Sequence, residues 1–323
     1  MILEVRNLKK YFETRKGLLN QSSYTVKAVD GVNFEVRQGE ALGIVGESGC
    51  GKTTAGRLIL HLITPSSGDV LFKGRSIYAF SREELKEYRR NVQLIFQDSF
   101  ASLDPRMRVG EIVGEALDVH RIAHTRNERE EIIVRIFSDV GLDREWIRRY
   151  PHEFSGGQRQ RIGIARALCL KPALIVCDEP VSALDVSIQA QILNLMKEIQ
   201  RKYQLSYVFI SHDLKVVKHV CDRVAVMYLG MNVEMCGKES LFASPLHPYT
   251  KALISVIPNP NPRIKRKKIT LGGEANLLAA DQGGCRFADR CSEVKERCRQ
   301  ESPELVEVKK DHFVACHLAG IGG

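Results

Sequence analysis

Short apolar stretches alternate with amphipathic ones along the first 240 residues of the chain. Six segments are predicted to be strands, at 3–5, 32–36, 41–45, 69–72, 173–177 and 206–210. Four segments with a helical apolar period are predicted to be helices: 53–63, 128–140, 188–203 and a segment that follows Gly157 and runs through Leu170. Strands that alternate with helices in this way predict an α/β domain with a mainly parallel sheet.

The character of the chain changes after residue 244. Five prolines between residues 245 and 262 precede the basic run 263–268, and together they indicate a linker. From Gly272 onward the chain is small and polar, and it holds four of the nine cysteines. We therefore expect one domain over residues 1–244 and a small cysteine-rich extension over residues 245–323.

Composition adds limits to this picture. No segment approaches the ~20 apolar residues of a membrane-spanning helix, and the first residues lack the apolar core of a signal peptide. We expect a cytoplasmic protein with reduced cysteines, whose contact with any membrane comes through a partner. The net charge of +9 fits an anionic partner and a merely solubilising surface equally well.

Residues 46–53 match the phosphate-binding P-loop pattern in full. The glycines let backbone N–H groups turn toward phosphate oxygens, and the following helix aims its positive end at the same charge. Lys52 is expected to reach the β- and γ-phosphates, while the Thr53 hydroxyl binds Mg²⁺. A chance glycine-rich turn is disfavoured by the apolar strand before it and the helix after it. The predicted ATP-binding residues here are Gly46, Ser48, Gly49, Cys50, Gly51, Lys52, Thr53 and Thr54.

Two carboxylates, Asp178 and Glu179, end the apolar segment 173–177. At the end of a buried strand downstream of a P-loop, Asp178 is expected near Mg²⁺, and Glu179 is expected to polarise the attacking water as general base. A merely solvated acid pair is the poorer interpretation at this position.

A serine and two glycines, Ser155, Gly156 and Gly157, precede the helix predicted to run through Leu170, and Gln158 follows them directly. They indicate a second phosphate cradle, although one ATP needs only one. A plain helix cap by Ser155 is the alternative, and it does not by itself account for Gly-Gly-Gln.

Together these motifs resemble an ATP-binding-cassette (ABC) ATPase over roughly residues 1–240. The resemblance implies a P-loop domain with a RecA-like core, an antiparallel β subdomain and a helical signature subdomain at about 99–165. It assigns Gln97 to the Q-loop, where it binds Mg²⁺ with Thr53 and Asp178. It also implies that Gln97 and His212, the switch histidine, are catalytic together with Glu179.

The same resemblance places Asp185 in the D-loop and Tyr11 against adenine, with Phe12 as the neighbouring alternative. It implies a head-to-tail dimer in which residues 155–158 close over the ATP of the partner subunit. Phe154 stands where the family usually has leucine, a mild apolar change that should preserve packing.

A finer resemblance is to the ATPase subunits of peptide/oligopeptide/nickel importers, and most to the second of their two ATPase subunits. It is carried by residues 8–12, 96–106 and 247–253 and by the cysteine tail. It implies ATP-driven uptake of di-/oligopeptides or related small solutes. The implied partners are a homologous ATPase in a heterodimer, two membrane permease subunits and, indirectly, an extracytoplasmic solute-binding protein.

Such a subunit would lie peripherally at the cytoplasmic face of the membrane, with residues 98–109 receiving the coupling helix of a permease. An ordinary loop is the alternative for this segment. The competing function is a soluble ABC ATPase that acts on nucleic acid or the ribosome through the basic run. With one P-loop and no long heptad region, the chain favours the importer, for which we expect no nucleic-acid partner.

Four cysteines, Cys285, Cys291, Cys298 and Cys316, are concentrated in the tail. They could hold a metal or a cluster or remain free, and zinc sites usually show closer pairs. His312 and His317 are possible substitute ligands. Some members of the importer family carry a [4Fe–4S] cluster at such cysteines, which favours a structural iron–sulfur cluster over zinc. A metal- or redox-sensing protein is a third function class, but no electron partner or substrate site is evident. The other five cysteines are expected to be packing residues.

Overall fold

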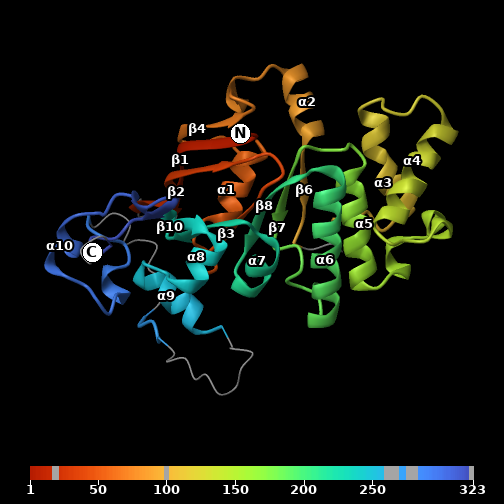
Figure 1. Cartoon of the computed structure of the whole chain (residues 1–323). Helices are drawn as coiled ribbons and strands as arrows, with labels where there is room; N and C mark the ends of the chain where they lie inside the picture. Colours follow the sequence, from red (N-terminus) through yellow and green to blue (C-terminus); the bar gives the residue numbers. More distant parts are fainter. Residues whose placement is uncertain (17–21, 98–101, 258–268, 274–282, 320–323) are drawn as a thin grey trace. The chain divides into compact units, whose positions relative to one another are not determined.

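The computed structural model describes residues 1–16, 22–97, 102–257, 269–273 and 283–319 (Figure 1). The chain forms two compact units. The helical unit comprises Met1–Ile2, Val36–Glu40 and Ala79–Phe209. The P-loop unit comprises Leu3–Glu35, Ala41–Tyr78 and Ile210–Gly323.

The helical unit combines a short run of strands with the longest helices of the chain. Its strands lie in the order β8-β7-β6, with bounds β6 (Val92–Ile95), β7 (Leu174–Asp178) and β8 (Ser206–Ser211), of which β8 belongs to this unit up to Phe209. Its helices are α2 (Arg82–Asn91), α3 (Val109–Val119), α4 (Arg126–Asp139), α5 (Gly156–Leu168) and α6 (Val186–Tyr203), with 3-10 turns at η2 (Arg144–Arg148) and η3 (Pro151–Glu153). Helices α3, α4 and α5 pack on one another, and α6 lies beside α5 (Figure 1).

The P-loop unit contains two sheets. One has the order β2-β1-β4-β5, from β1 (Leu3–Lys16), β2 (Ser22–Val36), β4 (Ser67–Phe72) and β5 (Arg75–Ser76). The other has the order β11-β12-β10-β9-β3, from β3 (Ala41–Val45), β9 (Arg223–Tyr228), β10 (Met231–Gly237), β11 (Val306–Lys309) and β12 (His312–Val314). The helices are α1 (Lys52–Ile59), α7 (Leu214–Val220), α8 (Lys238–Ala243), α9 (Pro248–Ser255) and α10 (Glu296–Gln300), with 3-10 turns at η1 (Ile77–Ala79) and η5 (Ala288–Arg290).

Pairing within the sheets is mixed. The pairs β3–β9 and β6–β7 are parallel, as predicted, and β1–β4 and β4–β5 form the expected antiparallel part. Strand β10 returns antiparallel to β9 because Leu229 and Gly230 between them both have left-handed φ angles of 42° and 84°. Two such residues form a tight hairpin turn, which forces neighbouring strands to run in opposite directions.

The helix after the P-loop is shorter than its apolar pattern predicts. The prediction extended to residue 63, whereas α1 ends at Ile59. His61 adopts a left-handed φ of 50°, and the Leu62 N–H donates to the Arg57 carbonyl oxygen at 2.9 Å. This hydrogen bond caps the C-terminus of α1, so the apolar residues that follow do not continue the helix.

The C-terminal extension is hydrogen-bonded into the P-loop unit. Strand β12 pairs antiparallel with β10, and β11 pairs with β12. The fully buried carboxylate of Glu234 on β10 accepts the N–H groups of Leu246 and His247, at 2.8 and 2.9 Å, and contacts His312 Nε2 at 2.7 Å. One carboxylate therefore fixes both the start of α9 and strand β12. The predicted boundary between residues 244 and 245, and that of the helical subdomain at 99–165, stay predictions.

Four rings pack together where the extension meets β9. The ring centroid of Phe287 lies 5.2 Å from that of Tyr228, 5.5 Å from that of Tyr249 and 5.6 Å from that of His247. His247 Nδ1 also accepts the Tyr249 N–H at 3.0 Å, which caps α9. Burial, with a smaller effect of the Lys251 charge, lowers the pKa of His247 to about 3.

This neutral histidine makes stability fall at acid pH. Below pH ~6.5 the unfolded chain protonates residue 247 and the folded chain does not, until the pH nears 3. By pH 4 this difference costs up to about 3 kcal/mol of unfolding free energy. His247→Asn keeps a capping acceptor but removes the titration.

We expect urea unfolding, followed by circular dichroism, to give a shallower loss of stability between pH 7 and pH 4 in this variant than in the wild type. His152→Asn, at an exposed side chain, is the control for removing an imidazole. Parallel pH profiles for wild type and His247→Asn would contradict the assignment.

Candidate functional site

The loop between β3 and α1 can form only with glycines at fixed places. Gly51 has a φ of 104°, and a Cβ there would lie 2.0 Å from the carbonyl oxygen of Ala28. At Gly46 a Cβ would lie 2.2 Å from the carbonyl oxygen of Met227. Both distances are far below any real contact, so the loop backbone packs directly on neighbouring strands.

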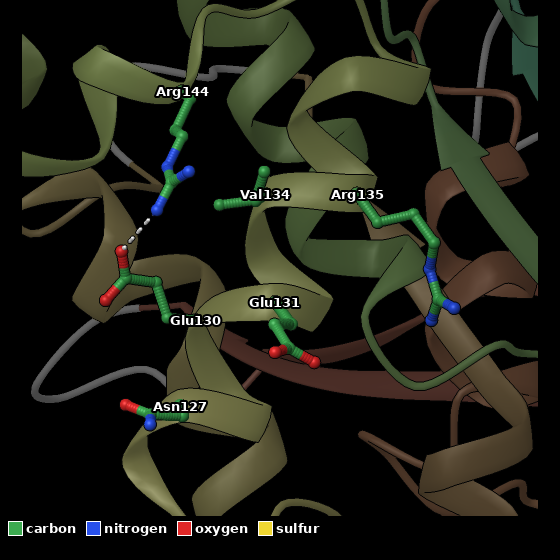
Figure 2. Close-up of a pocket in the computed structure, with 6 residues that line it drawn as sticks. All are labelled: Asn127, Glu130, Glu131, Val134, Arg135 and Arg144. Carbon is green, nitrogen blue, oxygen red and sulfur yellow. Dashed lines mark hydrogen bonds and ion pairs between the residues drawn. The ribbon is translucent and has the colours of Figure 1, made fainter.

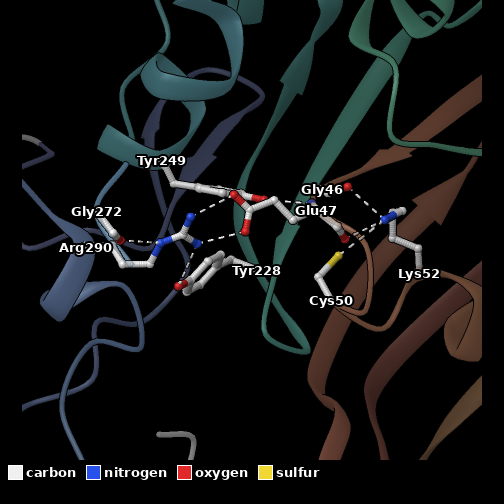
Figure 3. Close-up of polar contacts among 8 residues, drawn as sticks. All are labelled: Gly46, Glu47, Cys50, Lys52, Tyr228, Tyr249, Gly272 and Arg290. Atoms are coloured by element: carbon white, nitrogen blue, oxygen red, sulfur yellow. Dashed lines mark hydrogen bonds and ion pairs between the residues drawn. The ribbon is translucent and has the colours of Figure 1, made fainter. Parts of the chain in front are cut away.

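Lys52 is the first residue of α1, and its side chain folds back into the loop (Figure 3). Nζ donates to the carbonyl oxygens of Gly46 and Glu47, both at 2.8 Å, and lies 3.7 Å from Cys50 Sγ. Gly51 provides no side-chain cap for α1, so the first N–H groups of the helix keep their capacity to bind an anion. Gly46, Glu47 and Cys50 of the loop thus surround one ammonium group.

The two aromatic candidates for adenine stacking lie on β1. The Tyr11 hydroxyl donates to Asp30 Oδ1 at 2.5 Å, and the Lys27 Nζ stands 5.9 Å from the Tyr11 ring centroid. Phe12 is 41% exposed, with Lys10 Nζ 5.2 Å from its ring centroid. Tyr11 is therefore the more firmly held of the two, and its contact with adenine stays a prediction.

Gln97 and Glu179 are brought together within the helical unit. Gln97 Nε2 donates to Glu179 Oε2 at 3.0 Å. Glu179 follows Asp178, the last residue of β7, and has a left-handed φ of 47°. A non-glycine residue in this conformation carries strain of order 1–3 kcal/mol, which is typical of functional sites. The backbone turn separates the two acids, and Gln97 fixes the orientation of the second one.

Residues 155–158 cap α5, as the alternative interpretation of Ser155 expected, and Gln158 takes part in a way that the sequence did not reveal. Ser155 Oγ accepts the Gln158 N–H at 3.4 Å, and Gln158 Oε1 accepts the Ser155 N–H at 2.9 Å. This reciprocal capping box at the start of α5 explains Gln158 as well as Ser155. A Cβ on Gly157 would lie 2.6 Å from Ile188 Cγ2, so close packing explains one glycine. The phosphate-cradle role stays a prediction, alongside these structural ones.

Of three other residues that the sequence analysis named, two are exposed and one is buried. Asp185 is exposed at the start of α6, and the neighbouring Val186 is 82% exposed. His212 is exposed between β8 and α7, in the P-loop unit. Phe154 is buried, with its ring edge-on to Trp146 at a centroid distance of 5.7 Å, so the phenylalanine does preserve packing.

The four tail cysteines form one group in the P-loop unit. The Cys285 N–H donates to the Cys298 carbonyl oxygen at 2.7 Å. Burial raises the pKa of Cys285 to about 11, and the other three thiols add to this rise. Burial likewise raises the pKa values of Cys291 and Cys316, each of which is also influenced by Cys298.

The two histidines proposed as substitute ligands have other contacts. Glu234, Cys236 and His312 are the only three possible metal ligands in the described residues whose ligand atoms all lie within 4.8 Å of one another. His312 therefore belongs to the buried Glu234 group described above, whose carboxylate already accepts two backbone N–H groups. His317 Nε2 lies 2.9 Å from the carbonyl oxygen of Glu301.

The remaining five cysteines are buried, as expected of packing residues. They are Cys50, Cys169, Cys177, Cys221 and Cys236. Burial raises the pKa of Cys169 and of Cys236 to about 12, which keeps both thiols protonated.

A charged surface pocket on α4 contains none of the motif residues. It is lined by Asn127, Glu130, Glu131, Val134, Arg135 and Arg144 (Figure 2). Arg144 and Glu130 pair with each other at 3.5 Å, so part of its charge is internally balanced. This pocket is separate from the residues predicted to bind ATP.

Two interactions of the P-loop unit were missed by the motifs. Arg290 contacts Glu47 of the loop, and Arg286 contacts Asp30, the partner of Tyr11. No spacing rule marks either arginine. Their only distinguishing sequence feature is position, since each is adjacent to one of the clustered cysteines.

Comparison with known proteins gives a consistent answer over the whole chain. Residues 29–182 match the ABC transporter family, and residues 233–298 match the C-terminal region of oligopeptide/dipeptide transporters. The chain is 53% identical to the oligopeptide transport ATP-binding protein AppF of Bacillus subtilis, over 98% of this chain and 97% of that protein. It is 47% identical to OppF of the same organism, over 98% and 96% of the two chains.

Solved structures agree on the fold. A dimeric post-hydrolysis structure of the ATP-binding cassette MJ0796, bound to ADP and Pi, has a TM-score of 0.64 at 27% identity and covers 73% of this chain and 99% of its own. CbiO1 from Clostridium perfringens, part of the ABC transporter complex CbiONQ, also has a TM-score of 0.64, at 26% identity over 75% of this chain and 91% of its own. None of the helices among the described residues has the length and hydropathy of a membrane-spanning segment. The chain belongs to the ABC transporter ATPases, in the group that carries the oligopeptide/dipeptide transporter C-terminal region.

Proposed function

We propose that this chain is the ATP-hydrolysing subunit of an importer that takes up di-/oligopeptides or related small solutes through separate permease subunits. The observation that carries the proposal is similarity over 98% of the chain to ATP-binding proteins of oligopeptide transport. The similarity includes the extension, where residues 233–298 match the region specific to such transporters. The soluble nucleic-acid ABC ATPase has no such support.

The P-loop unit would bind the phosphates of ATP. Lys52 Nζ, now held by two loop carbonyl oxygens, can turn to the more strongly accepting phosphate oxygens. The loop N–H groups and the N-terminus of α1, which has no side-chain cap, would bind the same phosphates. Thr53, Gln97 and Asp178 would hold Mg²⁺, whose charge would stabilise the phosphates during hydrolysis.

Glu179 would act as the general base on the attacking water. Its carboxylate is oriented by the hydrogen bond from Gln97, and its backbone is turned out of the strand by the left-handed φ. The exposed His212 would contact the γ-phosphate, as the family resemblance implies. Positioning and charge stabilisation supply most of the catalysis in phosphoryl transfer, so orientation of this carboxylate matters more than its intrinsic basicity.

A homologous ATPase subunit would complete each ATP site. Ser155 and Gly156 are exposed, as are Asp185 and Val186 at the start of α6. The solved MJ0796 cassette is itself dimeric. By resemblance the partner is a second, different ATPase, which gives a heterodimer.

Two permease subunits would dock near residues 98–109, at the cytoplasmic face of the membrane, with a solute-binding protein acting on them from outside. Residues 98–101 lie outside the described part of the chain. Arg166 contacts residues on both sides of this segment. Its guanidinium lies 5.6 Å from the Phe96 ring centroid and donates to the Ser102 carbonyl oxygen at 2.5 Å. The Phe96 ring, which is 45% exposed, would offer an apolar contact to such a subunit.

The tail cysteines would hold a structural [4Fe–4S] cluster. Four thiols converge, which fits a four-ligand group, but in the described residues no three of their sulfurs lie within 4.8 Å of one another. A tetrahedral zinc site needs sulfurs about 3.8 Å apart, from Zn–S bonds of about 2.3 Å. A four-iron cluster is larger than one ion, so it suits this wider spacing better. Bound there, it would cross-link a tail too small for a core of its own.

Glu179→Gln should separate ATP binding from hydrolysis. The amide keeps the shape and the bond to Gln97 but cannot accept a proton. We expect ATP-analogue binding within about twofold of wild type and phosphate release by the assembled transporter reduced ~10²- to 10⁴-fold. Glu198→Gln, at an exposed position on α6, is the matched control. Turnover unchanged by Glu179→Gln would remove Glu179 as the base.

Gentle detergent extraction should recover the chain with its partners. We expect co-purification with a second ATPase and two hydrophobic permease subunits, and ATP hydrolysis that rises when a peptide-loaded binding protein is added. Recovery with ribosomes or nucleic acid, and none with membrane subunits, would sink the importer proposal.

Cys298→Ser should remove the bound metal if the tail holds a cluster. Anaerobically purified wild type is expected to absorb in the iron–sulfur charge-transfer region and to contain about four iron atoms per chain. We expect Cys298→Ser to lose most of this iron, whereas Cys169→Ser, at a buried thiol outside the tail, keeps it. A colourless wild type loaded with zinc would end the cluster proposal.

A further inference from the structure

The cysteine-bearing segment 285–291 sends two arginines toward the nucleotide-binding residues of its own unit. Arg286 follows Cys285 directly, and Arg290 precedes Cys291 directly. Both belong to the P-loop unit, and both are nearly buried, with side chains 9% and 10% exposed. Buried guanidinium groups require partners, and the partners here are residues of the ATP site.

Arg290 makes a two-pronged ion pair with Glu47, the second residue of the phosphate-binding loop (Figure 3). Nη1 donates to Oε2 at 2.8 Å, and Nη2 donates to Oε1 at 3.0 Å. The Glu47 N–H donates to the Tyr249 hydroxyl oxygen at 2.9 Å. Two residues of the extension, Arg290 and Tyr249, thus hold the side chain and the backbone of Glu47.

The guanidinium is also held by two further residues, Gly272 and Tyr228. Nε donates to the Gly272 carbonyl oxygen at 3.2 Å, Nη1 lies 3.3 Å from the Tyr228 hydroxyl, and the group stands 5.7 Å from the Tyr228 ring centroid. The hydrogen bond to Glu47 raises the pKa of Arg290 further above its usual range. A side chain fixed in this way has little freedom left to lose, so its ion pair is stronger than a typical surface pair.

Arg286 reaches the other end of the predicted ATP site. It donates to the Leu229 carbonyl oxygen and to Asp30 Oδ2. The other oxygen of Asp30 accepts from the Tyr11 hydroxyl at 2.5 Å. Burial favours the neutral form of Asp30, but the Tyr11 hydrogen bond and the Arg286 charge hold its pKa below its usual range. One short segment therefore contacts both Glu47 of the phosphate-binding loop and Asp30, the hydrogen-bond partner of Tyr11.

An unpaired carboxylate at Glu47 would weaken ATP binding, and Arg290 neutralises it. A carboxylate in the loop that binds the phosphates would repel the polyphosphate of ATP, because like charges destabilise each other most in a partly buried site. Its side chain is only 31% exposed, so water screens it incompletely. The bidentate guanidinium cancels this charge and at the same time holds the loop backbone in place.

We infer that Arg290 is a positioning residue of the ATP site, which neutralises Glu47 and thereby raises the affinity of the phosphate-binding loop for ATP. The inference rests on the proposed ATP binding. It assigns the extension a part in the reaction cycle of its own chain, in addition to any structural role of the cysteines.

The test is ATP affinity of the full-length chain, measured with a fluorescent ATP analogue and displaced by ATP. Arg290→Ala leaves Glu47 charged and unpaired, so ATP should bind about 10-fold more weakly. Arg290→Lys keeps the positive charge but not the bidentate geometry of the guanidinium, so it should recover part of the lost ATP affinity. In the assembled transporter Arg290→Ala should raise the KM for ATP by a similar factor and leave kcat within about twofold.

Two further variants distinguish neutralisation from a general loss of anchoring. In Glu47→Gln/Arg290→Ala no carboxylate remains, so ATP affinity should return to within about twofold of wild type. Arg299→Ala is the matched control, since Arg299 forms an exposed pair with Asp289 in the same tail and should bind ATP like the wild type. Thermal unfolding checks that each variant is folded.

Unchanged ATP affinity in folded Arg290→Ala, or a double variant that binds as weakly as Arg290→Ala, would overturn the inference. A wild-type chain that does not bind ATP would instead refute the proposed function.

Discussion

The ion pair between Glu47 and Arg290 is the contact on which the nucleotide-binding half of the structure depends. It joins residues 243 positions apart in the sequence, and the adjacent bond from the Glu47 N–H to Tyr249 joins residues 202 apart. A loop with four glycine or serine positions has little stiffness of its own. The extension supplies that stiffness, so the phosphate loop and the C-terminal region work as one structure.

The rest of the P-loop unit supports this contact. Glu234 fixes the start of α9, which carries Tyr249, and also fixes β12 through His312. The ring of Phe287 packs on Tyr228 and Tyr249, and so sets the place of the segment from which Arg290 extends. The four thiols lie at the two ends of this segment and beyond it, so a group bound there would hold the same segment from outside. The buried carboxylate of Glu234 therefore holds together the elements of the extension that reach the loop.

Local features were predictable from the sequence. Strand β3 has the predicted bounds, and α4, α5 and α6 lie within two residues of theirs, because apolar periodicity and glycine placement act over neighbouring residues. The motifs also singled out Gln97, Glu179 and Lys52, but not the hydrogen bond between the first two or the carbonyl contacts of the third. Strands β11 and β12 were not predicted, because such short segments become strands only by pairing: β12 pairs with the remote β10, and β11 pairs with β12. Arg290 was missed for the same reason, since its partner is remote in the sequence. The capping role of Gln158 was missed because the residue belongs to a motif that we interpreted as a phosphate cradle.

Amide hydrogen exchange at Glu47 tests the account most directly, because this N–H is the backbone group that the extension holds. We compare the full-length chain with Arg290→Ala and with the control Arg299→Ala, without nucleotide. The account predicts faster exchange at Glu47 and along residues 46–53 in Arg290→Ala alone. Exchange as slow in Arg290→Ala as in the wild type would contradict it, since the loop would then be ordered without the Glu47–Arg290 ion pair.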